Sequence, residues 1–438
     1  MKLNVRQLFA IILLLLLPAL SGCGQNNAAL PENLLNDAHL EHLTELFVLD
    51  GDTVEIVHIY CEYPDYRWVG DPDEGITCVD DVARAAVFYL RNYNYTGETS
   101  SKTHALRLLK FVEKMQAPNG AFYNFIFPDG QVNKDHENSR ARAGWWTWRA
   151  IWALSEAALL LGKEEPELAG RWRTAVERSF PLVDSILTAY PKTSRIDGFQ
   201  FPDWLPYGAA GDQAGVLLLA LNRYAASGGQ KSVETFRRRL LEGIMQMQAG
   251  DEKTPPYGAF LSWRNHWHAW GNLQAVAAFQ SWNLLKKPER KLLLQQTDYF
   301  LPWQLNEGFF NEFALTKSST GLELLHVKRF PQIAYGIRPM VWSALQAYEV
   351  TGRKKYARLA GKLAGWFFGN NPAGAPMYSP ETGRCYDGII GAGEVNRNSG
   401  AESTIEALLA LQEVLRNPIA SQELKLFIYK NWKNKDQN

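Results

Sequence analysis

Apolar side chains recur every three or four positions in most segments between residues 80 and 431, which is the spacing of one face of an α-helix. The pattern predicts twelve helices, at 80–93, 101–116, 144–161, 167–187, 212–226, 232–248, 267–285, 289–300, 337–351, 354–368, 403–416 and 421–431. Residues 53–64 instead alternate between polar and apolar, which is typical of a short strand. The sequence therefore predicts an all-α fold with a minor N-terminal strand.

The links between these predicted helices alternate between short and long. A short link such as Thr351–Arg353 makes the two helices of a pair antiparallel, so the chain is predicted to form six helical hairpins. The long links then share one face of the molecule, and they cover 117–143, 188–211, 249–266, 301–336 and 369–402. Met115-Gln116-Ala117 recurs as Met247-Gln248-Ala249, which is typical of stacked hairpins. Six hairpins closed into a ring form an (α/α)6 toroid.

Polar and aromatic residues gather where the first helix of each hairpin begins. The set that we expect around a cleft comprises Asp80, Asp81, Arg84, Arg140, Trp145, Trp146, Asp203, Trp204, Trp263, His266, Trp267, Arg338, Asn398 and Glu402. Each member also has a structural explanation, because acidic residues favour helix N-termini and tryptophans fill cores. Caps do not require a run such as Trp-Trp-x-Trp, however. The coincidence at one end of six hairpins therefore predicts a cleft.

Carboxyl pairs beside stacking aromatic rings are what glycoside hydrolysis requires. The reaction needs a protonated acid at the leaving oxygen and a carboxylate on the opposite side, about 6.5–9.5 Å away in an inverting enzyme. Ring closure would bring the first hairpin beside the last. We therefore expect Asp80 or Asp81 to act as the base and Glu402, with a pKa raised by burial, to act as the acid. Glu394 is the alternative acid. Arg84, one turn on, is expected to face the aspartates, and it and the rest of the set are expected to bind substrate.

Short motifs resemble those of known carbohydrate-active proteins. The hairpin pattern, with two aspartates at its first helix and a glutamate at its last, resembles the six-hairpin glycosidase superfamily, and Trp366–Pro372 is similar to a segment of family 9 glycoside hydrolases. Asp80–Arg84 and Asn398–Thr404 also resemble toroid domains that accompany some bacterial glycosyltransferases. The resemblance implies a carbohydrate-active toroid of the inverting type. The chain lacks the D-A-G-D signature of family 9, so cellulase activity is not implied.

Two other functions fit the same loops. Toroid polysaccharide lyases use Tyr, His, Asn and Arg for β-elimination from uronic acids, and Tyr257, Asn265, His266, Arg140 and Arg142 could serve in this way. The third possibility is a lipoprotein that binds glycans and catalyses nothing. A lyase would keep its activity when Glu402 is replaced, whereas a binding protein would release no product at all.

The charge balance narrows the range of partners. The chain has 46 basic and 46 acidic residues, so it lacks the basic surplus of a nucleic-acid binder. His266 and His268 are two positions apart and would not share a helix face, and the segment around Asp71 and Asp73 falls short of a calcium loop. We therefore expect a carbohydrate partner, no nucleic acid, and no cofactor or metal.

The N-terminus has the features of a bacterial lipoprotein. Residues 1–22 contain a basic start, an apolar run and a Leu-Ser-Gly box before Cys23, which predict a signal peptide and lipidation of that cysteine. The sequence thus predicts a protein of the bacterial envelope, anchored to the membrane and facing away from the cytoplasm, with a flexible tether at 23–40 and the toroid at 41–434. The other cysteines, of which two could pair, are Cys61, Cys78 and Cys385.

Overall fold

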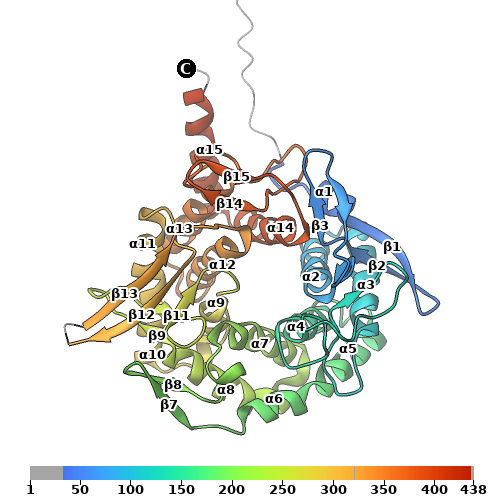
Figure 1. Ribbon diagram of the computed structural model, residues 1–438, viewed down its shortest axis with the longest axis horizontal. Coiled ribbons are helices and arrows are strands. Elements are labelled where there is room, and N and C mark those ends of the chain that lie inside the picture. Colours follow the sequence, from blue (N-terminus) through green and yellow to red (C-terminus); the bar gives the residue numbers. More distant parts are fainter. Residues whose placement is uncertain (1–32, 320, 436–438) are drawn as a thin grey trace, which may run out of the picture. The chain divides into compact units, whose positions relative to one another are not determined.

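Six helices form a closed inner ring in the computed structural model, which describes residues 33–319 and 321–435 (Figure 1). They are α2 (Val79–Thr96), α4 (Trp145–Leu160), α7 (Gly211–Tyr224), α9 (Gln274–Gln280), α12 (Ala334–Thr351) and α14 (Ala401–Arg416). Each packs against the next, and α14 packs against α2, so that the last hairpin meets the first. Nearly every position of α7 is buried, because an inner helix has protein on all sides.

The second helices of the hairpins form an outer layer around this ring. They are α3 (Thr99–Lys114), α5 (Pro166–Arg178), α6 (Phe180–Leu187), α8 (Gln230–Gln246), α10 (Lys287–Gln295), α11 (Leu301–Asn306), α13 (Lys354–Ala364) and α15 (Pro418–Lys435). In the side chains described, one face of each is buried and the other is exposed, as the helical periodicity requires. The predicted all-α toroid is therefore confirmed.

Three predicted helices differ from the observed ones. The segment 167–187 is divided into α5 and α6 just before Pro181, since a proline lacks the N–H and is tolerated only in a first turn. The segment 289–300 ends in a π-helical turn at Gln296–Phe300. The helix predicted for 267–285 begins only at Gln274, because His266–His268 forms a strand instead.

Short antiparallel strands form in the segment before α2 and in the long links. The pairs are β1 (Thr44–Leu49) with β2 (Asp52–Val57), β3 (Tyr60–Glu62) with β4 (Arg67–Val69), β5 (Thr77–Cys78) with β6 (Phe125–Ile126), β7 (Thr193–Ile196) with β8 (Phe199–Pro202), β9 (Gln248–Ala249) with β10 (Ala259–Phe260), and β14 (Gly388–Gly391) with β15 (Glu394–Asn396). A three-stranded sheet joins β11 (His266–His268), β12 (Glu312–Ser318) and β13 (Gly321–Lys328). The predicted strand at 53–64 corresponds to β2 and β3.

The N-terminal part of the described chain is packed on the toroid. Leu34 is buried, and so is Leu40 in the short helix α1 (Ala38–Leu43). The backbone N–H of Asn36 donates to the Tyr378 hydroxyl at 2.9 Å. The tether predicted for 23–40 therefore does not extend to residue 40, and the toroid begins before residue 41.

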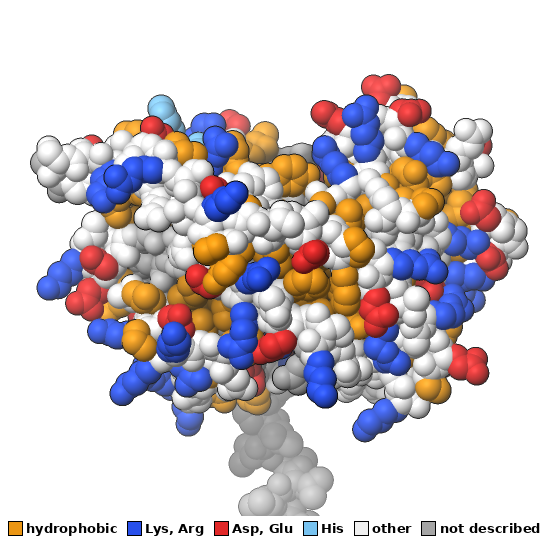
Figure 2. Space-filling view, turned by 90° about the horizontal axis from the view of Figure 1, so that it is seen from below, with side chains coloured by type: hydrophobic (Ala, Val, Ile, Leu, Met, Phe, Trp, Pro, Cys, Tyr) orange, Lys and Arg blue, Asp and Glu red, His pale blue; other side chains and the backbone are white. Residues whose placement is uncertain are grey.

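The predicted signal peptide at 1–22 and the lipidation site at Cys23 lie outside the described residues and stay predictions. Among the described residues, none of the helices has an apolar stretch long enough to cross a bilayer. Basic and acidic side chains are interspersed over the face shown in Figure 2. Such a mixture gives that face no strong field of one sign.

Candidate active site

The N-terminal ends of four inner helices surround a cavity of about 690 Å³. We call it the first cavity. Its lining includes Asp80, Asp81, Arg84, Trp145, Trp146, Trp270, Tyr335, Asp387 and Glu402. All inner helices point the same way, because each hairpin returns the chain to its starting side. Their positive dipole ends therefore converge on this cavity, where they favour negative charge.

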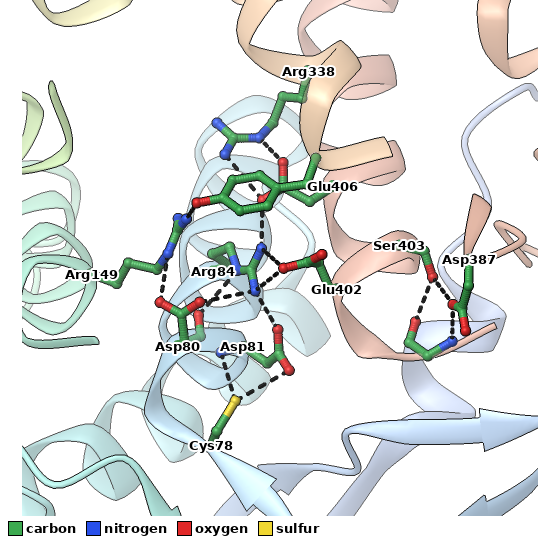
Figure 3. A network of polar contacts seen from close by, with 12 residues as sticks. Cys78, Asp80, Asp81, Arg84, Arg149, Arg338, Asp387, Glu402, Ser403 and Glu406 are labelled. Atoms are coloured by element: carbon green, nitrogen blue, oxygen red, sulfur yellow. Dashed lines mark hydrogen bonds and ion pairs between the residues drawn. The ribbon is translucent and has the colours of Figure 1, made fainter. Parts of the chain in front are cut away.

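Arg84 joins the first hairpin to the last at the wall of this cavity (Figure 3). Its Nη2 donates to Asp81 Oδ1 at 2.6 Å, to Asp80 Oδ2 at 3.2 Å and to Glu402 Oε2 at 3.3 Å. Its Nη1 donates to Glu406 Oε1 at 2.8 Å. The ring thus brings together the aspartates of α2 and the glutamate of α14 that sequence analysis paired.

The two aspartates are not equivalent. The Asp81 side chain is only 4% exposed, and its Oδ2 accepts a 3.2 Å hydrogen bond from the Cys78 thiol. Burial raises the pKa of Asp81, while the Arg84 guanidinium acts against the rise. The Asp80 side chain is 22% exposed, and Arg149 Nε lies 2.6 Å from its Oδ1. Asp80 is therefore the member of the pair with more surface open to the cavity.

Glu402 faces the cavity with 43% of its side chain exposed. Protein nevertheless surrounds the carboxyl group closely enough to displace much of its water. This burial raises the pKa of Glu402 to about 7, against the opposing effect of Arg84 and with a further contribution from the negative charge of Asp81. A carboxyl group of this kind exchanges its proton near neutral pH, which suits general acid–base catalysis.

The floor beneath these residues is a buried ionic cluster. Arg338 and Glu406 are both fully buried and pair with one another, with Arg338 Nη2 donating to Glu406 Oε1 at 3.0 Å. Arg149 is also buried and donates to the Tyr335 hydroxyl. The predicted contact of Arg338 with substrate is therefore wrong, because Arg338 lies below the cavity wall and neutralises Glu406.

A second cavity of about 570 Å³ adjoins the first. The two share Trp145, Trp146 and Trp270, so together they form one cleft. Trp263 and Tyr207 line the second cavity and are 42% and 54% exposed. Two neighbouring cavities lined by indole and phenol rings leave room for more than one sugar unit.

A histidine–aspartate pair lies in the wall of the second cavity. His268 Nε2 is 3.0 Å from Asp212 Oδ2, and His268 Nδ1 is 2.8 Å from the Trp270 carbonyl oxygen. The imidazole also stacks on the Trp270 indole, with ring centres 3.7 Å apart. Both ring nitrogens are thus occupied, and the pair fixes the orientation of the tryptophan that separates the two cavities.

Several predicted substrate-binding residues line the cleft and others do not. Trp145 and Trp146 line both cavities, and Trp263 and His266 line the second. Trp204 and Trp267 are each only 1% exposed. Trp204 Nε1 donates to the Arg239 carbonyl oxygen, and Trp267 stacks on Phe313. Substrate contacts predicted for these two tryptophans are therefore wrong, because both side chains belong to the core.

Three more members of the predicted set lie outside both cavities. Arg140 is exposed and donates from Nε to the Asp135 carbonyl oxygen. Asn398 Oδ1 accepts from the Tyr63 backbone N–H, which ties the last long link to β3. Asp203 follows β8, away from the cleft lining. The Arg140 and Asn398 side chains therefore order loops, and none of the three lines the cleft.

The residues named for a lyase are not assembled at one place. Arg142 and His266 line the second cavity, but Tyr257 packs edge-on against Trp303 at 5.4 Å, and Asn265 Nδ2 donates to a backbone carbonyl. Glu394, the alternative acid, is exposed on β15 and lines neither cavity.

The cysteines form no disulfide among the described residues, and the expectation of a metal-free site is not tested. The three described cysteines, Cys61, Cys78 and Cys385, are buried free thiols, so the pairing considered for them is not formed. Across the described chain no three His, Cys, Asp or Glu side chains are grouped for a metal ion, and a metal-free site stays a prediction.

Sequence reasoning missed Asp387 of the first cavity, and it placed Tyr335 and Trp270 on the loop face without counting them among the substrate-binding residues. Asp387 lies inside a long link without periodicity, where no pattern marks a functional side chain. Tyr335 and Trp270 are brought to the cavity by the starts of α12 and α9, and their role depends on the closed ring.

Similarity to known proteins is seen in the fold alone. No protein family matches this sequence, and no curated protein is similar to it. Among solved structures, a sugar epimerase from a ruminal bacterium has a TM-score of 0.59 and 14% identity, over 84% of this chain and 94% of that one. The cellobiose 2-epimerase from Spirochaeta thermophila has a TM-score of 0.55 and 12% identity, over 85% of this chain and 90% of that one. This protein is an α/α toroid. A D-mannose isomerase has a TM-score of 0.52 and 14% identity, over 82% of this chain and 91% of that one.

Proposed function

We propose that this protein is a glycoside hydrolase that acts on an uncharged oligosaccharide, with Glu402 as the general acid. The observation that carries the proposal is a carboxyl group, at the wall of an aromatic cavity, whose pKa burial raises to about 7. At neutral pH such a group is partly protonated and can give its proton to a leaving oxygen. The likeness of the fold to enzymes named for their action on sugars supports a carbohydrate substrate.

The carboxylates around Glu402 would stabilise the transition state. As the glycosidic bond breaks, positive charge develops on the sugar ring, and Asp80 supplies negative charge on the α2 side. Arg84 Nη2 lies 3.2 Å from Asp80 Oδ2 and 3.3 Å from Glu402 Oε2, so these oxygens are at most about 6.5 Å apart. That upper limit only reaches the lower edge of the inverting range of about 6.5–9.5 Å, so Asp80 and Glu402 are close together for an inverting pair.

The charge of the first cavity favours an uncharged sugar. Four of its lining residues are acidic, namely Asp80, Asp81, Asp387 and Glu402, whereas Arg84 is the one basic side chain among the described lining residues. A uronic acid would therefore meet like charge. Indole faces pack well against the apolar C–H faces of neutral pyranose rings, which is consistent with Trp145, Trp146 and Trp270 at this place.

Hydrolysis is expected to fail as the pH rises. A general acid works only in its protonated form, and Glu402 loses its proton as the pH passes about 7. We expect kcat/KM to fall about tenfold for each pH unit above that value. Initial rates between pH 5 and 9 measure the profile. A rate that stays level up to pH 9 would contradict the role given to Glu402.

Longer substrates are expected to depend on Trp263. Replacing Trp263 with Ala removes an exposed ring from the second cavity, and we expect KM for an oligosaccharide to rise about tenfold, equivalent to about 1.4 kcal/mol. An aryl monoglycoside, which occupies only the first cavity, should be cleaved as before. Trp68→Ala is the matched control, because Trp68 is 41% exposed but lies outside the cleft. Equal losses on short and long substrates would contradict the assignment.

A sugar epimerase or isomerase is the second candidate. The observation that favours it is the fold: the solved structures with TM-scores of 0.52–0.59 carry the names of sugar epimerases and an isomerase. Proton exchange at a sugar carbon also needs an acid–base group near neutral pH, which Glu402 could supply. Hydrolysis is preferred because further carboxylates line the cavity with Glu402, and glycosidic cleavage requires a pair of carboxyl groups.

One experiment separates these reactions. The purified protein is incubated in deuterium oxide with a panel of neutral and uronic oligosaccharides, and products are analysed by mass spectrometry and NMR. New reducing ends without deuterium on carbon support the hydrolase. Carbon-bound deuterium without cleavage would establish the epimerase or isomerase, and unsaturated products would establish a lyase. Quenching of tryptophan fluorescence by the sugars without any product would indicate a protein that binds glycans and catalyses nothing.

A further inference from the structure

Asp387 is a carboxyl group of the first cavity that the proposed hydrolysis has not yet used. It ends the long loop between α13 and β14, and it lines the cavity with Glu402. Its Oδ1 accepts hydrogen bonds from the Gly400 backbone N–H at 2.8 Å and from the Ser403 hydroxyl at 2.6 Å (Figure 3). Its Oδ2 has no partner among the described residues and is not among the fully buried atoms. One oxygen therefore holds the side chain in place, and the other is free for a ligand.

The other two aspartates of the cavity have both oxygens beside guanidinium or thiol groups. Asp80 Oδ1 is buried beside Arg149, and its Oδ2 accepts from Arg84. The oxygens of Asp81 accept from Arg84 and from a thiol. Among the described residues, no basic side chain forms an ion pair with Asp387. A carboxylate whose oxygens already bind guanidinium groups has little capacity left to take up a proton, and Asp387 is free of that restraint.

The start of α14 carries Glu402 and, through hydrogen bonds, holds Asp387 of the preceding loop at the same cavity. Glu402 points to Arg84, whereas the next residue, Ser403, holds Asp387 on the opposite side of the helix start (Figure 3). An inverting reaction needs two carboxyl groups that face one another with space for a water molecule. Arg84 stands between Asp80 and Glu402, so that pair lacks such a space. Burial also raises the pKa of Asp387, against the hydrogen bonds that it accepts, which strengthens it as a base.

We propose that Asp387, rather than Asp80, is the general base that activates the attacking water. This inference rests on the proposed hydrolase function. The water oxygen forms a bond to the anomeric carbon while its proton passes to Asp387 Oδ2. The bond from that carbon to the glycosidic oxygen breaks, and Glu402 gives its proton to the leaving oxygen. Proton exchange with solvent then restores both carboxyl groups.

Two variants of Asp387 test the proposal on a 4-nitrophenyl glycoside that the wild type cleaves. Asp387→Asn keeps the Oδ1 acceptor for Gly400 and Ser403, so the fold should persist, yet kcat/KM should fall by about 10²–10⁴-fold. Asp387→Ala leaves space for an external nucleophile, and sodium azide should restore its turnover and yield a glycosyl azide of inverted configuration. Glu381→Gln, an exposed carboxylate of the same loop, is the control and should keep wild-type activity.

The outcomes distinguish this inference from the hydrolase function itself. Azide rescue of Asp387→Ala supports the base, because a residue with a purely structural role would not be rescued. Wild-type activity in Asp387→Asn, or rescue by azide of Asp80→Ala in its place, would overturn the assignment while hydrolysis stands. Absence of any cleavage by the wild type, across the aryl glycosides and the oligosaccharide panel, would overturn both.

Discussion

Glu402→Gln is expected to lower kcat on an oligosaccharide by about 10²–10⁴-fold while the fold and glycan binding remain intact. Glutamine has the shape of the glutamic acid side chain but no proton to give to the leaving oxygen. The side chain is 43% exposed, and among the described residues only Arg84 donates a hydrogen bond to it, so the substitution removes little that stabilises the protein. Circular dichroism checks the fold, and titration of tryptophan fluorescence with the oligosaccharide checks binding.

The alternative acid provides the comparison. Glu394 lies on β15 outside both cavities, and Glu394→Gln should therefore retain activity. If Glu402→Gln keeps full activity and Glu394→Gln loses it, the acid has been assigned to the wrong residue.

Arg84→Met is expected to cause the largest loss of stability, about 3–5 kcal/mol in the free energy of unfolding. Arg84 is fully buried and pairs with Asp80, Asp81, Glu402 and Glu406. Removing its charge leaves these carboxylates close together in a poorly solvated place. Urea unfolding at pH 7 measures the effect. Arg67→Met is the matched control and should change stability by less than about 1 kcal/mol, since Arg67 is 83% exposed and 3.9 Å from Asp65.

The pH dependence gives this stability prediction a second test. Although burial opposes it, pairing with Arg338 and Arg84 lowers the pKa of Glu406. A depressed folded-state pKa contributes stability above the unfolded value, and this contribution is lost as the pH falls through the folded pKa. The loss of unfolding free energy in Arg84→Met should therefore be greatest near neutral pH and should shrink in acid, where the carboxylates are protonated. A deficit that grows in acid would mean that Arg84 stabilises the fold by packing alone.

The toroid could be predicted because its signals are local. Helical periodicity and the alternation of short and long links require only neighbouring residues, and they imply hairpins whose ends share a face. The same logic placed Asp80 and Glu402, which stand at helix starts, on one rim of a closed ring. Their contact through Arg84 follows from the closure of α14 on α2.

The rest of the site depends on tertiary structure and could not be predicted. Trp263, Trp267 and Trp270 repeat at helical spacing, yet Trp267 belongs to a strand, and its ring packs against Phe313 in the core. Burial of a tryptophan depends on which distant segments cover it, and local spacing does not reveal that. Asp387 lies in an aperiodic link, and only the arrangement of that link over α14 brings its carboxyl group to the cavity.

The transfer of a proton from Glu402 to the leaving oxygen is tested most directly by varying the leaving group. The wild type and Glu402→Gln are compared on aryl glycosides whose phenols span a wide range of pKa values. A good leaving group needs no proton. The loss of kcat/KM in Glu402→Gln should therefore be small for 4-nitrophenol and should increase steadily as the phenol becomes less acidic. A deficit of the same size for every leaving group, or no deficit at all, would contradict the account.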